Sequence, residues 1–223
     1  MGGGLGSKYS KLVNGTRAGN GKENWYALNL LEELDRPGEW CLRFPAKTLY
    51  LWPPTDLAET SVLISDMEEP LIDFDNASHV TVSGFTLEGG LGNGVEIDGG
   101  SDVLVGGCEI RNLAGTGVVV NGGRKHRVVS CDTHHLGKGG IYVGGGDRKT
   151  LTPGSHQVLN NHIHRVGQLQ TTYAPAIMVG AYRNSDPVGR GFRAEAVGCR
   201  VAHNLIHDLP PAAVLYGGKE NVL

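Results

Sequence analysis

The chain has 223 residues, 35 of them glycine, and a formal net charge of −3. This length suits one domain with a sizeable core, and the slight excess of acidic groups argues against a nucleic acid partner, which normally requires a basic face. We also expect no membrane partner, because no run of about 18 apolar residues is present, and the start MGGGLGSKYSKL has no signal-peptide core, which leaves the localisation open.

Residues 1–60 are predicted to form an N-terminal segment that precedes the main domain. The stretch NWYALNLLEELD, residues 24–35, has apolar positions at helical spacing and a Pro-Gly stop after it, which favours a short helix. Residues 39–44 and 48–52 favour a β-hairpin. We expect the helix and the hairpin to cover the open end of the following domain, because an uncovered strand edge promotes aggregation.

Residues 61–223 contain a repeat of 23 residues, and its later copies are lengthened by insertions. Equivalent apolar positions form columns, namely Ile72, Val95, Val118 and Ile141, and Val82, Val105, Val128, Val158 and Val201. Short alternating strands between glycine-rich corners are typical of a parallel β-helix, in which coils stack about 4.8 Å apart. The sequence therefore predicts an all-β fold, a parallel β-helix of about five coils, which the usual crossover rule makes right-handed.

Another column should point into the solenoid. Phe85, Cys108 and Cys131 occupy this column in the early coils, and Asn161 and Asn204 continue it. Asparagine fits an inward corner because its amide can bond to the neighbouring coil. A disulfide between the two cysteines is an alternative, but stacked Cβ atoms about 4.8 Å apart are slightly too distant for relaxed geometry. Buried free thiols are therefore favoured.

Three insertions interrupt the later repeats, at residues 144–157, 167–175 and 180–199. Long loops on a regular scaffold often carry binding sites. The insertions lie on adjacent coils, so we expect them to combine into one cleft. The chain ends just after the fifth copy, and we therefore expect either self-association through the last coil or a longer natural protein.

The residues LLEELDRPGEW, followed by TLYLWPP and then by a repeat with NHIH and AHNLIHD, resemble bacterial right-handed parallel β-helix proteins similar to glycoside hydrolase family 141. The resemblance covers roughly residues 22–223. It implies a secreted or periplasmic protein that acts on plant or microbial polysaccharide. The family's proposed catalytic acids lie on coils after the AHNLIHD coil, where no position of this chain matches them. The resemblance therefore implies a fragment or a shortened member, and it identifies no catalytic residue.

A column of histidines is the main candidate site. The aligned repeats place Arg111, His134, His164 and His207 at equivalent positions that should face outward. Imidazoles can contact sugar hydroxyls, and one can act as a general acid or base near neutral pH. The alternative is an exposed column without chemistry. A zinc site that combines His162 with two of these histidines lacks a Cys or carboxylate at tight spacing, so no metal and no cofactor are predicted.

The candidate residues are those nearest to this column and to the insertions. The catalytic candidates are Asp132, His134 and His164, and the substrate-binding candidates are Tyr173, His207, Asp208, Arg183 and Arg148. Glycosidases need two carboxylates, and Asp75 and Asp98 form a second possible pair at stacked positions. Their alternative explanation is a corner column, where Asp favours turns without any chemistry.

The function predicted from these observations is that of a carbohydrate-active protein of the glycoside hydrolase type, with polysaccharide or oligosaccharide as its partner. One alternative is a polysaccharide lyase, for which the arginines of the insertions would supply the positive charge that a uronic acid substrate needs. The other alternative is a glycan-binding or structural β-helix without catalysis, because this scaffold supports many functions.

Overall fold

The computed structural model describes residues 29–43, 45–59, 61–180, 195–209 and 212–223. The chain divides into two compact units, Met1–Val62 and Leu63–Leu223. In the first unit, β1 (Trp40–Arg43) and β2 (Thr48–Leu51) form the predicted antiparallel hairpin. Two short 3-10 turns flank it, η1 (Leu31–Glu33) and η2 (Leu57–Glu59). Within the described ranges, no helix is both long and apolar enough to cross a membrane.

The prediction of a helix over residues 24–35 is wrong for residues 29–35, the part that the structure describes. Residues 24–28 lie outside the described residues, and only the single turn η1 forms beyond them. Asn29 has a φ of 61°, which no α-helix accepts. Its side chain accepts a hydrogen bond from the backbone N–H of Leu42 and donates one to the Leu42 carbonyl. This attachment to the hairpin overrides the helical spacing, and the covering of the first coil stays a prediction.

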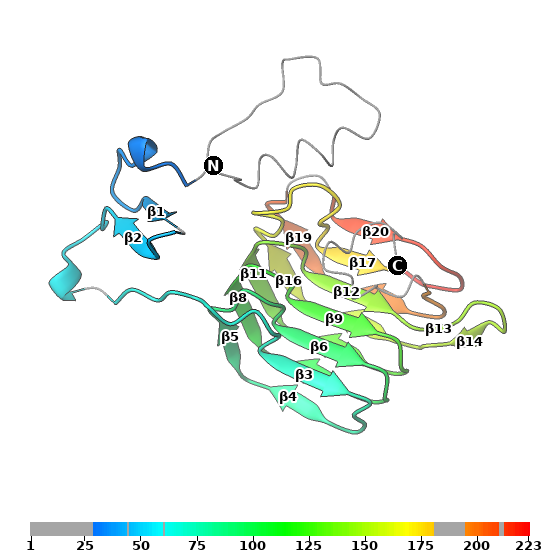
Figure 1. Cartoon of the computed structure of the whole chain (residues 1–223). Coiled ribbons are helices and arrows are strands. Elements are labelled where there is room, and N and C mark those ends of the chain that lie inside the picture. Colours follow the sequence, from blue (N-terminus) through cyan, green and yellow to red (C-terminus); the bar gives the residue numbers. More distant parts are fainter. Residues whose placement is uncertain (1–28, 44, 60, 181–194, 210–211) are drawn as a thin grey trace, which may run out of the picture. The chain divides into compact units, whose positions relative to one another are not determined.

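The second unit is a parallel β-helix with three long sheets. Figure 1 shows how the strands of successive coils stack side by side. Sheet I contains β3 (Ile72–Asp75), β6 (Val95–Asp98), β9 (Val118–Asn121), β12 (Ile141–Gly144), β17 (Ile177–Val179) and β20 (Val214–Tyr216). Sheet II contains β4 (Thr81–Ser83), β7 (Leu104–Gly106), β10 (Arg127–Val129), β15 (Gln157–Leu159) and β18 (Arg200–Ala202). Sheet III contains β5 (Thr86–Glu88), β8 (Glu109–Leu113), β11 (Asp132–Leu136), β16 (His162–His164) and β19 (Leu205–His207). The chain passes through sheets I, II and III in turn in each coil.

The predicted repeat sets the strand register of this solenoid, because equivalent repeat positions are paired on neighbouring strands. Ile72 pairs with Val95, Val95 with Val118, and Val118 with Ile141. The valine column of sheet II is paired in the same way across all five strands. These side chains form one continuous buried cluster, against which the partly buried Ile72 of the first coil packs. Because each coil rests on its neighbour, a residue's equivalent in the repeat is also its contact in space.

The predicted inward column at the start of sheet III is confirmed for its thiols and amides. Cys108 and Cys131 are buried and free. Asn161 Oδ1 accepts the backbone N–H of Cys131 at 2.9 Å, and Asn204 Oδ1 accepts that of Asn161 at 2.9 Å. Phe85 is the exception, since its side chain is 57% exposed. A phenyl ring is larger than the thiols that occupy this corner, and it offers no polar group for the backbone there.

A second inward polar column, at the start of sheet II, was not predicted. His126 and His156 are each 1% exposed, and their rings stack at 5.0 Å. Nδ1 of His126 accepts the backbone N–H of Val103 at 3.2 Å, and Nδ1 of His156 accepts that of His126 at 3.1 Å. Both rings are therefore neutral, with the proton on Nε2, and Nε2 of His126 can donate to the Gly99 carbonyl, 2.9 Å away. A Cβ at Gly145 would collide with the His156 ring.

The three insertions lie at two different corners of the coil. Residues 144–157 follow sheet I and include the hairpin of β13 (Gly146–Asp147) and β14 (Thr152–Pro153). The described end of insertion 180–199 occupies the same corner, where Gly145 pairs with Ala196. Residues 167–175 instead follow sheet III. The prediction of one common cleft is therefore wrong for the described residues, because loops at separate corners face different sides of the solenoid.

The buried thiols should be unreactive in the folded protein. Burial raises the pKa of Cys131 and of Cys199 to about 11, and only the thiolate is nucleophilic. We expect labelling by an aromatic disulfide reagent at pH 8 to be slower than that of a free cysteine by on the order of 100-fold. The control is the same protein in guanidinium chloride, in which all four cysteines should react. Rapid labelling before unfolding would contradict this expectation.

Candidate functional site

The outer face of sheet III carries two rows of side chains that run across successive coils. Alternate residues of each strand point outward, which places one row at the first strand position and the other at the third. The first row consists of Thr86, Glu109, Asp132, His162 and Leu205, and the second of Glu88, Arg111, His134, His164 and His207. The pairing confirms the predicted column from Arg111 to His207.

A third row joins this face because the backbone becomes left-handed at the residue directly after the second row, inside β8 and β11 and just past the ends of β16 and β19. Asn112, His135, Arg165 and Asp208 directly follow the second row, and their φ angles lie between 50° and 52°. Regular strand alternation would direct these side chains inward. The change of backbone conformation instead brings His135 beside His134, with ring centroids 4.9 Å apart. Sequence periodicity does not reveal this row, because a period of two applies only where the backbone is continuously extended.

Carboxylates and one guanidinium group form the end of the site nearest the first coil. Arg111 donates from Nε to Glu88 at 2.7 Å and from Nη1 to Glu109 at 2.8 Å. Glu109 also lies within reach of the Thr86 hydroxyl at 3.4 Å. The hydrogen bond to Arg111, with its positive charge, lowers the pKa of Glu88. Glu109 was not predicted, although its position one repeat before Asp132 was visible in the sequence.

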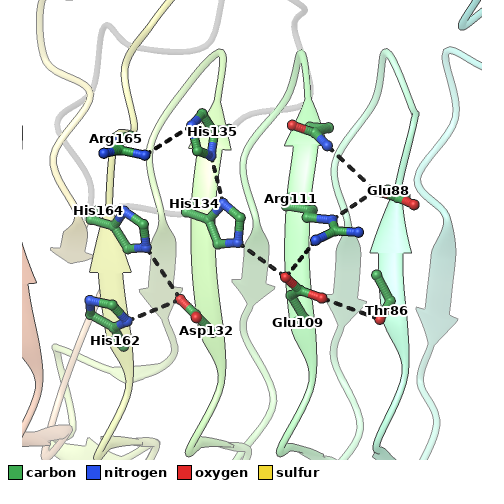
Figure 2. A network of polar contacts seen from close by, with 11 residues as sticks. Thr86, Glu88, Glu109, Arg111, Asp132, His134, His135, His162, His164 and Arg165 are labelled. Atoms are coloured by element: carbon green, nitrogen blue, oxygen red, sulfur yellow. Dashed lines mark hydrogen bonds and ion pairs between the residues drawn. The ribbon is translucent and has the colours of Figure 1, made fainter. Parts of the chain in front are cut away.

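Four side chains form a line of contacts on this face, shown in Figure 2. Arg165 Nη1 lies 3.5 Å from His135 Nε2, His135 Nδ1 lies 2.6 Å from His134 Nδ1, and His134 Nε2 lies 3.3 Å from Glu109. Because arginine can only donate, His135 must accept at Nε2 and donate from Nδ1. His134 must then accept at Nδ1 and donate from Nε2 to Glu109. One arrangement of protons, with both rings neutral, therefore satisfies the whole line.

Asp132 lies at the centre of the imidazoles. Its Oδ1 is 3.2 Å from His162 Nδ1 and 3.5 Å from His164 Nε2, as Figure 2 shows. These distances are those of ion pairs, but neither contact has hydrogen-bond geometry, and Oδ1 is buried without a hydrogen bond from any described residue. Nδ1 of His164 is in the same situation. Burial, and then the neighbouring His162 and His134, lower the pKa of His164.

The remaining histidine contacts extend the cluster toward the last coil. His162 and His207 approach each other at 2.8 Å between their Nε2 atoms, so one must donate and the other accept. His207 Nδ1 lies 3.1 Å from Asp208, and His207 stacks on His164 at 5.0 Å. His207 and Asp208, both predicted substrate contacts, thus lie on the same face as Asp132.

The other predicted site residues lie elsewhere. Tyr173 is 46% exposed in the loop between β16 and β17. Arg148 is exposed on the turn between β13 and β14, at the corner after sheet I. Arg183 lies outside the described residues. The structure therefore brings together Asp132, the histidines and Asp208, and it does not bring Arg148 to them.

The second carboxylate pair, Asp75 and Asp98, has the predicted register but lies away from the histidines. Asp75 pairs with Asp98 and Asp98 with Asn121, at the ends of the sheet I strands. Asp75 accepts a hydrogen bond from the adjacent Asn76 side chain at 2.8 Å. This column belongs to sheet I, so it is separate from the histidine face.

Parallel strands that stack coil on coil define the class of parallel β-helix proteins. In this protein, one of the sheets carries rows of polar side chains on its outer face. Comparison with known families identifies the family. Residues 70–222 match the model of the right handed beta helix region, so the chain belongs to this family. The fold is therefore a right-handed parallel β-helix, as predicted. No curated protein and no solved structure matches the chain.

Proposed function

We propose that this protein acts on a polysaccharide that lies across the coils on the outer face of sheet III. The observation that carries the proposal is the continuous set of carboxylate, imidazole and guanidinium groups on that face. Such groups supply both donors and acceptors for sugar hydroxyls. The rows run along the solenoid axis, so a linear chain can contact several coils at once.

The proposed activity is glycoside hydrolysis, with Asp132 and Glu109 as the carboxylate pair. These residues are direct partners on β8 and β11, and neighbouring strands are about 4.8 Å apart. Retaining glycosidases hold their two carboxyl groups about 5 Å apart. Arg111 and Thr86 orient Glu109 for attack on the sugar, and Asp132, whose Oδ1 accepts no hydrogen bond from a described residue, would act as the general acid. The resemblance to glycoside hydrolase family 141 favours hydrolysis over elimination.

A lyase on the same face is the second candidate, and Arg111 and Arg165 are the observation that favours it. Two guanidinium groups beside neutral imidazoles could hold a uronic carboxylate next to a base. Elimination would produce unsaturated sugars that absorb in the ultraviolet, whereas hydrolysis would produce reducing ends without that absorbance.

The test is turnover of a panel of neutral and acidic polysaccharides by the wild type and by Asp132→Asn and Glu109→Gln. We expect each substitution to reduce turnover by at least about 100-fold, the typical size of a general acid–base contribution. Asp98→Asn is the matched control, because this carboxylate lies on sheet I, and it should change turnover less than about twofold. Binding without turnover by the wild type would support the non-catalytic alternative and contradict this proposal.

A further inference from the structure

We propose that Asp132, His134 and His164 bind a divalent transition-metal cation of the zinc type. One nitrogen of each imidazole and one oxygen of the carboxylate all lie within 4.8 Å of one another. The three residues come from two neighbouring strands, β11 and β16, whose parallel pairing places His134 directly opposite His164. The backbone alone therefore brings the three ligands together.

The distances require only side-chain movement to complete the site. Zinc lies about 2.0–2.2 Å from nitrogen and oxygen ligands, so tetrahedral ligand atoms are about 3.3 Å apart. His164 Nε2 and Asp132 Oδ1 are already 3.5 Å apart. The ring of His134, stacked on that of His164 with centroids 4.9 Å apart, must turn toward them. Its competing contact, at 3.3 Å to Glu109, is a long hydrogen bond that a cation can replace.

An orphaned carboxylate oxygen supports the site independently of this spacing. Asp132 Oδ1 and His164 Nδ1 are buried and have no hydrogen bond within the described part of the chain. Buried polar atoms without partners are rare in folded proteins. A cation coordinated by Asp132 would satisfy the first of them directly. Coordination through Nε2 would fix the proton of His164 on Nδ1.

His135 supplies the outer contact that metal-bound histidines usually have. When a cation takes Nε2 of His134, the proton of that ring moves to Nδ1, where His135 Nδ1 lies at 2.6 Å and can accept it. The proton of His135 then moves to Nε2, which breaks only the long contact of 3.5 Å with Arg165. Both rings stay neutral. His135 therefore orients His134 with and without the cation, and it acts as a positioning residue.

The donor set indicates the class of cation. Two imidazole nitrogens and one carboxylate oxygen suit zinc and its first-row neighbours, whereas calcium and magnesium prefer oxygen ligands alone. Three protein ligands also leave at least one position for water. The Asp132 side chain is 46% exposed, so solvent reaches the carboxylate side of the site, while the side chains of His134 and His164 are only 13% and 14% exposed.

The test is a calorimetric titration of the chelator-treated, full-length protein with zinc chloride. A second titration with cobalt chloride is followed by visible absorption. We expect one equivalent to bind. Asp132→Asn, His134→Gln and His164→Gln should each weaken binding by at least about tenfold. The matched control is His79→Asn, because His79 is a 78% exposed histidine on another corner whose φ of 59° suits asparagine. It should leave the affinity unchanged.

Several outcomes would overturn the proposal. Binding that survives all three substitutions would show an adventitious surface site. The absence of zinc-specific binding by the wild type would show that the cluster is not a metal site. Loss of binding in His162→Gln but not in His134→Gln would assign the cation to the other end of the cluster. X-ray absorption of the zinc-loaded wild type requires no variant, and it should show two imidazoles. None of these measurements depends on polysaccharide turnover, so failure of the metal site can be told apart from failure of the proposed function. A cation on Asp132 would occupy the carboxylate that the proposed hydrolysis uses, so zinc that binds as proposed should inhibit that hydrolysis.

Discussion

Lowering the pH from 6.5 to 3.5 should remove about 4 kcal/mol of folding free energy through His156 alone, at about 1.4 kcal/mol per pH unit. Burial, and then the neighbouring His126, lower the pKa of His156 to about 3. In the unfolded chain a histidine has a pKa of about 6.5. Between these values the unfolded state binds one more proton than the native state. The contribution is therefore complete above pH 6.5 and is lost as the pH falls.

The measurement is urea unfolding at a series of pH values between 4 and 7.5, with the slope of unfolding free energy against pH as the readout. His156→Asn keeps an acceptor for the His126 N–H but cannot titrate, so its slope should be smaller by about one proton. Carboxylates contribute to both proteins and cancel in this difference. His79→Asn, which removes an exposed histidine, should leave the slope unchanged. An unchanged slope in His156→Asn would refute the assignment.

Asn161→Ala should destabilise the protein by about 2–5 kcal/mol, because it leaves several buried groups without partners. The Asn161 side chain is 1% exposed. It accepts from the Cys131 N–H and donates to the Val128 carbonyl at 3.0 Å and to Asn204 at 2.9 Å. A single water in the space left by the amide could not restore all three hydrogen bonds in the geometry that the amide provides.

Asn204→Ala is the natural comparison for this variant. Asn204 holds the same position one coil later and makes the same kinds of bond, but it is more exposed than Asn161. Water can therefore replace some of the hydrogen bonds that the substitution removes. We expect the free energy of unfolding to fall by only about 1–2 kcal/mol. Thermal and urea unfolding of the two variants gives the comparison. Equal losses would mean that burial does not determine the strength of this ladder.

The two predictions concern one structural problem with two solutions. At each inward corner a backbone N–H points along the solenoid axis and needs an acceptor from the next coil. Asn161 provides Oδ1 at the sheet III corner, and His156 provides Nδ1 at the sheet II corner. The imidazole replaces the amide as the acceptor, but it adds a sensitivity to acid that the amide does not have.

Much of the solenoid could be predicted from the sequence because its repeat has a direct spatial meaning. The step of 23 residues from Val82 to Val105 and Val128 is the register of sheet II. The same alignment of repeats predicts that His134 lies opposite His164, and the two strands pair in that register. No comparable rule exists for residues 24–35, where helical spacing competes with a long-range pairing to Leu42 that spacing cannot reveal.

The sequence by itself determined the repeat, the inward apolar columns and the outward histidine column, because parallel stacking converts equal sequence intervals into contacts. Only the tertiary structure decided what happens where the extended backbone is interrupted. There, left-handed backbone turned His135 onto the site, and the corner of sheet II turned His126 and His156 into the core. The distribution of the insertions between two corners was decided there too. Corners follow local backbone conformation and hydrogen bonding between coils, neither of which has a period that a single sequence displays.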